Sequence, residues 1–301
     1  MSNIENIIAH LDQDVNLKTT FFDTLEDWYR LERQKIINIK KFAPYIAYFI
    51  IAIPVCLIFF ACLLNGFLEV LIFLIIISAV IMCERRIKVS HKRSVNKYFD
   101  SIDLTYRKIN TNDFPDLKNT LNKLLNNVGL KDYEVKMFFD RNNHYVPAVC
   151  ERIDEQGKII YFLLSRNLLM LHNLNRILFE SIIYHELGHI NQHDTNLWIE
   201  RNLEKEKIKY TWIAYIFSIP TILFRLLANS NAKKHYKQER RNAEHYADLY
   251  SIINSKNFGI VGFLEGNYLS DSEDHDHPLP KARIDFIEKI VNKVFLKIKL
   301  D

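Results

Sequence analysis

The sequence predicts a mainly helical α+β protein in which a helical hairpin of membrane length precedes a domain with a small antiparallel sheet. Three observations lead to this prediction. The run Ala43 to Leu64 carries no charge and is followed, after Asn65-Gly66, by a second apolar run. Much of the remaining chain places apolar residues at helical spacing. Three short runs after residue 130 have the composition and length of strands.

Composition restricts the classes of function. A chain of 301 residues can hold one globular domain and an accessory segment. Its 40 Lys and Arg residues nearly balance 36 Asp and Glu residues, and the formal net charge of +4 is small, so no nucleic-acid partner is predicted. No paired spacing that would indicate a disulfide framework or a cysteine-ligated metal occurs among the four cysteines, Cys56, Cys62, Cys83 and Cys150.

Residues 1–42 are predicted to be an amphipathic helical leader. Apolar residues such as Phe21, Phe22 and Leu25 recur at helical spacing among charges, and the segment has no internal Gly or Pro. It is far too polar for a secretory signal. We expect it to be cytoplasmic, and it is a candidate binding segment for a regulatory partner.

Residues 43–83 are predicted to form a transmembrane hairpin in the lipid bilayer. The first arm, Ala43 to Leu64, would be about 33 Å long as a helix, which is enough to span the hydrocarbon core. The second arm, Phe67 to Cys83, is at the lower limit for a span and carries Glu69 near its start, where headgroups can solvate it. The alternative is a buried hairpin of a soluble domain.

The distribution of positive charge predicts the orientation of the hairpin. Lys and Arg residues gather before the first arm and after the second, and none lies between them. Because positive flanks tend to stay in the cytoplasm, we expect both ends of the hairpin to be cytoplasmic. The chain is therefore predicted to be an integral membrane protein with a cytoplasmic N-terminus and a cytoplasmic C-terminal domain.

Residues 84–130 are predicted to be a helical connector that breaks at Asp113-Phe114-Pro115 and ends at Gly129. Residues 131–301 are predicted to form the C-terminal domain. Its small antiparallel sheet is expected from three runs, Tyr133 to Phe139, Tyr145 to Ile153 and Lys158 to Leu164, with Asp154 to Gly157 as the turn between the last two. Asn173 or Asn175 is predicted to cap the helix that follows, which runs to about residue 192.

That helix carries the pattern His-Glu-x-x-His in His185-Glu186-Leu187-Gly188-His189. Residues four apart lie on one helix face, so His185 and His189 can hold one metal ion while Glu186 points at a metal-bound water. The alternative is a surface helix that carries two histidines by chance. A hydrolytic zinc site needs a third protein ligand. His193 is excluded because it lies about 12 Å along the helix from His185, and it is expected to be a rim or structural residue.

Glu244 is the predicted third ligand. In Glu244-His245-Tyr246-Ala247-Asp248, the first and last residues share a helix face one turn apart, and the small Ala247 would let two helices approach. Glu244 can ligate the metal while Asp248 accepts the outer N–H of a ligating imidazole. Both parts of the site must lie on one side of the membrane. The apolar segment Thr211 to Ala228 (211–228) is therefore predicted to be a re-entrant or interfacial helix or a buried wall of the site, and not a single span.

These motifs, followed by His277-Pro278 and Arg283-Ile284, resemble the integral-membrane zinc metalloprotease family that contains the heat-shock protease HtpX and the CAAX prenyl proteases. The resemblance covers roughly residues 130 to 290 and implies a zincin-like, gluzincin fold for the C-terminal domain. It implies a zinc metalloendopeptidase of the bacterial inner (cytoplasmic) membrane that acts on membrane or misfolded proteins, with one Zn²⁺ per chain. It also implies that His277 and Arg283 lie near the cleft, where they position substrate or stabilise developing charge. The family commonly carries two further membrane segments before the glutamate, where this chain has one apolar run.

In the expected reaction, zinc polarises a water and the scissile carbonyl, and Glu186 takes the water proton and delivers it to the leaving amine. An extended protein or peptide substrate is expected to pair with the edge of the strand Tyr145 to Ile153. The candidate substrate-binding residues near this strand are Asn143, His144 and Ala148. Two alternatives remain: an intramembrane metalloprotease, and a membrane-tethered zinc-binding scaffold or sensor without proteolytic activity.

Overall fold

The computed structural model describes residues 3–66, most of 99–191, 240–266 and 278–300, with a few isolated positions between these ranges. The chain divides into two compact units. One unit joins residues 1–25 to residues 99–301, and the other contains residues 26–98. The first unit carries both the sheet and the predicted metal-binding residues.

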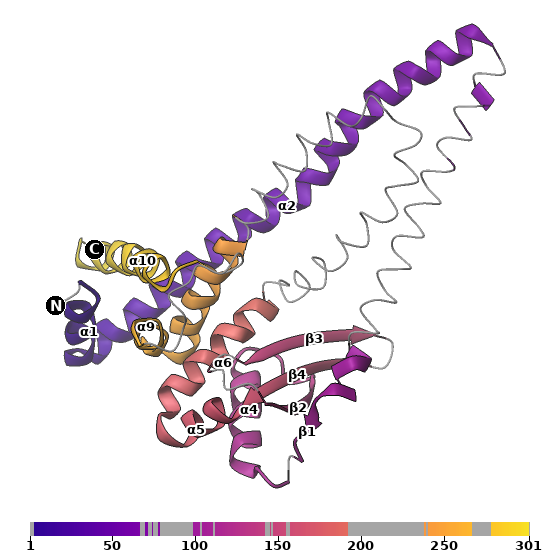
Figure 1. The fold of residues 1–301 in the computed structure, drawn as a ribbon. Coiled ribbons are helices and arrows are strands. Elements are labelled where there is room, and N and C mark those ends of the chain that lie inside the picture. Colours follow the sequence, from indigo (N-terminus) through magenta and orange to yellow (C-terminus); the bar gives the residue numbers. More distant parts are fainter. Residues whose placement is uncertain are drawn as a thin grey trace. The chain divides into compact units, whose positions relative to one another are not determined.

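The described part of the chain is mainly helical (Figure 1). The labelled helices are α1 (Asn3–Gln13), α2 (Val15–Asn65), α4 (Pro115–Asn127), α5 (Arg166–Leu174), α6 (Arg176–Asn191), α9 (Gly259–Glu265) and α10 (Pro280–Leu300). A further helix covers residues 240–255. The strands are β1 (Arg107–Lys108), β2 (Glu134–Asp140), β3 (Ala148–Asp154) and β4 (Gly157–Ser165). This arrangement confirms the predicted mainly helical α+β class.

The four strands form a mixed sheet in the order β1-β2-β4-β3. The prediction of an antiparallel sheet is wrong for the central pair, because β2 and β4 run parallel while β3 and β4 run antiparallel. Strand β3 runs opposite to both β2 and β4, and β4 lies between β2 and β3 in the sheet, so β2 and β4 are parallel neighbours. The turn between β3 and β4 closes at the pair Asp154 and Gly157, as predicted, and Gly157 has the positive φ of +143° that glycine tolerates.

The predicted connector contains a strand that the pattern did not indicate. Arg107 and Lys108 form β1, which pairs antiparallel with β2 at Phe138 and Phe139. Two residues are too few to produce a recognisable alternation, so β1 leaves no sequence signal. The predicted break before Pro115 and the end at Gly129 agree with α4, which is followed by Gly129 at φ +77°.

Strand β4 is buried on both faces from Ile159 to Ser165 because it lies inside the sheet and is covered by helices. Helix α5 contacts β4, helix α6 contacts β3, and α4 packs against α6 (Figure 1). The sheet therefore supports α6, the helix that carries the two predicted histidine ligands.

The predicted leader is helical, and its first 25 residues belong to the sheet-containing unit. The chain breaks between α1 and α2 at Asp14, whose carboxylate accepts hydrogen bonds from the backbone N–H groups of Asn16 and Leu17 at 2.9 and 3.0 Å. Phe21 and Phe22 are buried and lie 6.2 and 6.1 Å, ring centre to ring centre, from Phe258. This part of the apolar face is therefore covered within the chain.

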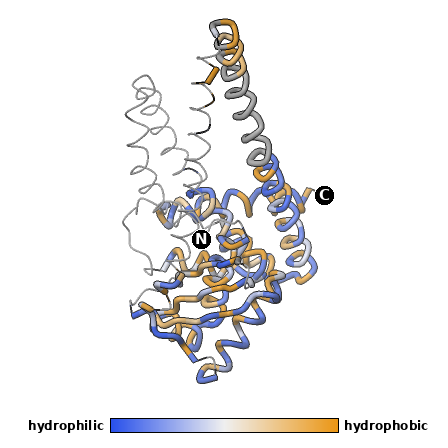
Figure 2. Tube along the Cα trace, turned by 90° about the vertical axis from the view of Figure 1, so that its right-hand side faces the viewer, coloured by the Kyte–Doolittle hydropathy of each residue, from blue (hydrophilic) through white to orange (hydrophobic). Residues whose placement is uncertain are grey.

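Among the residues that the structure describes, no helix is both long enough and apolar enough to cross a membrane. The first arm of the predicted hairpin coincides with the end of α2, and the far end of this long helix is coloured mainly hydrophobic in Figure 2. The second arm lies mostly outside the described residues, and the predicted segment Thr211 to Ala228 lies wholly outside them.

Candidate metal centre

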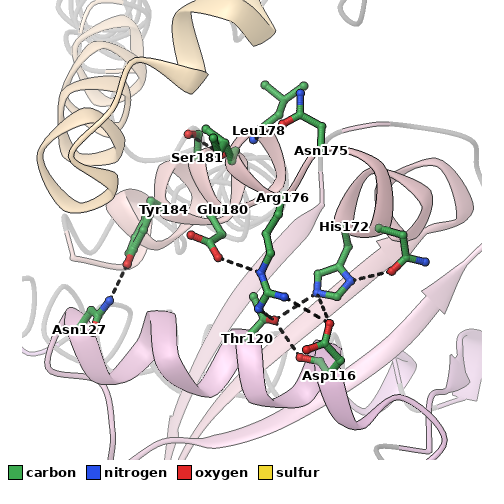
Figure 3. Close-up of polar contacts among 12 residues, drawn as sticks. Asp116, Thr120, Asn127, His172, Asn175, Arg176, Leu178, Glu180, Ser181 and Tyr184 are labelled. Carbon is green, nitrogen blue, oxygen red and sulfur yellow. Dashed lines mark hydrogen bonds and ion pairs between the residues drawn. The ribbon is translucent and has the colours of Figure 1, made fainter. Parts of the chain in front are cut away.

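Helix α6 begins at a polar cluster that joins three helices (Figure 3). Arg176 donates hydrogen bonds to Glu180 at 3.2 Å, to Asp116 at 3.3 Å and, through a short contact, to the Thr120 hydroxyl. The same hydroxyl lies 3.1 Å from Nε2 of the buried His172. These contacts hold α4, α5 and the start of α6 together.

The cap of α6 is Asn175, one of the two residues predicted for this role. Its side-chain oxygen accepts a hydrogen bond from the backbone N–H of Leu178 at 3.1 Å (Figure 3). Further along α6, the Tyr184 hydroxyl accepts a hydrogen bond from Asn127 of α4 at 2.9 Å. The orientation of α6 is therefore fixed immediately before His185.

Close contact between α6 and the helix over residues 240–255 brings the two halves of the site together. A Cβ atom on Gly188 would lie 3.0 Å from Cα of Ala247, which is closer than side chains normally come. The hydroxyl of Ser251 also donates a 2.6 Å hydrogen bond to the carbonyl oxygen of Ser181. Gly188 and Ala247 therefore permit the approach that places Glu244 beside the two histidines.

His185, His189 and Glu244 form a group whose candidate ligand atoms all lie within 4.8 Å of one another. Nε2 of His185 lies 3.2 Å from Nε2 of His189 and 3.4 Å from one carboxylate oxygen of Glu244. The other carboxylate oxygen lies 3.5 Å from Nε2 of His189. The group could therefore hold a metal ion.

The chemistry and spacing of these three residues fit a divalent transition metal. Two imidazoles and one carboxylate are a ligand set used by catalytic zinc sites. Ligands about 2.0 to 2.1 Å from a tetrahedral ion are separated from one another by roughly 3.3 Å, close to the separations between these ligand atoms. The same ligand chemistry suits other first-row divalent ions, so the ligand set by itself does not select zinc.

Asp248 lies behind the first histidine, as the sequence predicts. Its carboxylate accepts the Nδ1–H of His185 across 2.9 Å, and the side chain is fully buried. With Nδ1 committed to Asp248, Nε2 is the nitrogen that faces Glu244 and that would bind a metal ion once its own proton is released. Burial would raise the pKa of Asp248, but Arg283 and His185 outweigh it and hold the pKa below its usual value.

The two histidines have opposite pKa shifts. Burial lowers the pKa of His185, but the carboxylates of Asp248 and Glu244 outweigh burial and raise the pKa to about 9. Burial also lowers the pKa of His189, and there the opposing attraction of Glu244 is too weak, so the pKa falls to about 4. At neutral pH a metal ion therefore meets a neutral His189 and a protonated His185.

The structure describes three of the remaining predicted site residues, Glu186, Arg283 and Ala148, and leaves the others outside the described ranges. Glu186 is half-buried on α6 next to His185. Arg283 is buried in the first turns of α10, where it contacts Asp248 and Glu244. Ala148 begins β3, opposite Leu163 of β4. His193, His277, Asn143 and His144 lie outside the described residues.

Sequence reasoning did not find the small polar residues that lock α6 to its neighbours. Ser181 donates a hydrogen bond to Asn257, which is 76 residues away in sequence, and accepts one from Ser251, which is 70 residues away. Gly259, at the start of α9, has no room for a side chain beside Ser181. No local spacing signals such contacts, because each partner lies on a different segment.

Comparison of the chain with protein-family models, with curated proteins and with solved structures found no match. Function must therefore be inferred from the residues of the site and from the sequence motifs that contain them.

Proposed function

We propose that this protein is a zinc-dependent metalloendopeptidase related to the HtpX and CAAX prenyl protease family. The observation that carries the proposal is the convergence of His185, His189 and Glu244 within 4.8 Å. The carboxylate of Asp248 against the outer nitrogen of His185 supports it, because this contact is typical of metal-binding histidines. A bound zinc ion would supply Lewis acidity toward a carbonyl oxygen and a water.

The chain's own residues would hold the reactants and move the proton. Glu186 follows His185 directly on α6, so its carboxylate is the proposed base that takes a proton from water and returns it to the leaving amine. Asp248 keeps the His185 ring in one tautomer and orientation. His277 is proposed to lie near the cleft and to stabilise developing charge, on the resemblance alone.

The proposed substrate is a protein segment in extended conformation. Strand β3 is an end strand of the four-stranded sheet and therefore offers backbone groups to an added strand. It also contacts α6, the helix of the two histidines. We place the peptide along β3 from Ala148, with Asn143 and His144 just before the strand as further contacts.

We also propose that residues 43–83 anchor the protein in the bacterial inner membrane. The uncharged sequence Ala43 to Leu64 supports this anchoring. The apolar side chains of Leu57, Phe60 and Leu63 on α2 are exposed, which also fits contact with lipid. After alkaline carbonate extraction of membranes, the protein should remain in the pellet, and release into the supernatant would contradict the anchor.

The test of the catalytic role compares wild-type protein with Glu186→Gln. Protein purified in detergent should contain one zinc ion per chain and cleave casein or an unfolded membrane protein, and a chelator should abolish cleavage until zinc is restored. Glu186→Gln should keep zinc and lose roughly 10²- to 10⁴-fold in rate. The matched control is Glu265→Gln, which removes an exposed carboxylate on α9.

The outcomes separate the candidate functions. Cleavage by zinc-loaded Glu186→Gln at the wild-type rate would contradict the proposed base. Wild-type protein that binds zinc and cleaves none of these substrates would favour a scaffold or sensor. A chain that binds no divalent ion would remove the metal centre altogether.

A further inference from the structure

Arg283 is a buried cation between the two carboxylates of the metal centre. Only 5% of the residue is exposed. Its Nε donates a hydrogen bond to one oxygen of Asp248 at 2.8 Å, and a terminal nitrogen donates one to the other oxygen. The remaining terminal nitrogen lies 3.3 Å from Glu244. Each of the three guanidinium nitrogens therefore faces a carboxylate of the protein itself.

We propose that Arg283 is a positioning residue that orients Glu244 for metal binding and presses Asp248 against His185, and that it does not contact substrate. This inference rests on the metal centre of the proposed function, and it changes the role that the sequence suggests for Arg283. The resemblance implies that Arg283 lies near the cleft, where it would position substrate or stabilise developing charge.

The geometry of the guanidinium supports a positioning role. Arginine presents its donors in a planar fork that matches a carboxylate through two parallel bonds, so it fixes the plane of the Asp248 carboxylate as well as its position. The third nitrogen forms an ion pair with one oxygen of Glu244 at 3.3 Å. Because only 5% of the arginine is exposed and each of its three nitrogens is turned to a carboxylate of the protein, the geometry favours these partners over a peptide.

The charges support the same role. Asp248 is 0% exposed and Glu244 is 5% exposed, and two buried carboxylates so close together need a cation. Arginine stays protonated at all ordinary pH values, so it compensates the carboxylates before any metal ion arrives. The ligands are therefore placed in advance, and the metal ion does not have to draw Glu244 into position.

The position of Arg283 extends the metal centre to a third helix. His185 and His189 lie on α6, Glu244 and Asp248 lie on the helix over residues 240–255, and Arg283 lies on α10. Helix α10 packs against α9 and α1. The orientation of Glu244 therefore depends on elements that supply no metal ligand.

The test measures metal binding directly in the full-length protein. Affinity for Zn²⁺ is obtained by competition with a chromogenic chelator, and the Co²⁺-substituted protein reports ligand geometry through its visible absorption. Arg283→Met should weaken Zn²⁺ binding by about 10- to 100-fold and alter the Co²⁺ spectrum. Lys289→Met, which removes an exposed positive charge from the same helix, should match wild type in both measurements.

Arg283→Lys tests the inference if Arg283→Met does not fold. A single ammonium group keeps the charge but cannot bond both carboxylates with the same geometry, so Zn²⁺ affinity should again fall and the Co²⁺ spectrum should again change. At saturating zinc, KM for a peptide should stay at the wild-type value in every Arg283 variant that binds metal.

Wild-type zinc affinity and an unchanged Co²⁺ spectrum in an Arg283 variant, with a raised KM, would overturn the inference and return Arg283 to the cleft. A second outcome is that the wild-type protein binds zinc and shows no peptidase activity, while the Arg283 variants lose zinc affinity. That result would support the positioning role of Arg283 and contradict the proposed peptidase function. Failure of the wild-type protein to bind Zn²⁺ or Co²⁺ would overturn both.

Discussion

Nδ1 of His185 and Oδ1 of Asp248 lie 2.9 Å apart, in a fully buried contact between α6 and the helix over residues 240–255. The contact decides which imidazole nitrogen remains for a metal ion, because Nδ1 shares its proton with Asp248 and only Nε2 can release its own proton to bind the ion. The affinity of the site should therefore depend on a residue that is not itself a ligand.

Replacement of Asp248 tests this dependence. In Asp248→Asn the neutral amide no longer attracts the His185 N–H as strongly, and it leaves Arg283 without one of its carboxylates. We expect Zn²⁺ affinity to fall by about 10- to 100-fold, measured by chelator competition. Asp285→Asn, an exposed position on α10, is the control. Equal Zn²⁺ affinities for Asp248→Asn and wild type would show that the contact with Asp248 does not affect metal binding by His185.

Metal affinity should rise with pH across the neutral range. The pKa of His185 is raised to about 9 and that of His189 is lowered to about 4, so between these values a metal ion must displace one proton, from His185. Affinity should therefore increase by about tenfold per pH unit from about pH 6 to pH 8 and level off as the pH passes through the His185 pKa. Isothermal titration in buffers of different ionisation enthalpy would count the proton released, and a count of zero at pH 7 would contradict the prediction.

Gly188→Ala should separate the two helices of the site. The new Cβ would lie 3.0 Å from Cα of Ala247 and 3.2 Å from Cβ of Tyr250, so the backbone must shift. We expect a loss of about 1 to 3 kcal/mol in the free energy of unfolding, together with weaker zinc binding.

Gly262→Ala in α9 is the matched control for this substitution, because nothing lies within 4 Å of its added Cβ. Alanine is the better helix former, so this variant should be stabilised by about 0.5 to 1 kcal/mol. Chemical denaturation of the two variants beside wild type measures both effects, and equal stabilities would show that α6 and its neighbour can move apart without cost.

The leader should contribute to the stability of the unit that carries the metal centre. Phe22 is 2% exposed and packs against Phe258, so Phe22→Ala should cost about 3 to 5 kcal/mol of unfolding free energy. Phe114, which is 45% exposed, is the control, and Phe114→Ala should change stability by no more than about 0.5 kcal/mol. If Phe22→Ala melts at the wild-type temperature, the leader is not part of the core.

Local spacing made much of the metal centre predictable. Helical periodicity places His185 and His189 on one face, and the same rule applied to Glu244 and Asp248 gives the pair of carboxylates that the structure brings to them. Arg283 could be found by resemblance, but its partners could not, because Asp248 lies 35 residues away on another helix. The residue pattern of one helix does not indicate which charged side chain of a neighbouring helix will contact it.

The fold was predictable to a similar depth. Alternation and turn residues located the three longer strands, but they specify faces and not neighbours, so the parallel pairing of β2 with β4 was missed. Likewise, the amphipathic leader showed that one face must be covered without showing that Phe258 covers it. Long-range partners are set by packing over the whole chain.

The discontinuity of the metal-bearing unit has a consequence for its biosynthesis. Residues 3–25 leave the ribosome long before residues 258–300, which supply Phe258 and α10 as their packing partners. During that interval the apolar side of α1 and early α2 has no native surface to cover it. A fragment that starts at residue 99 would lack this piece altogether. A fragment meant to carry the metal centre should keep residues 3–25 together with residues 99–301, and should not be trimmed from its amino end.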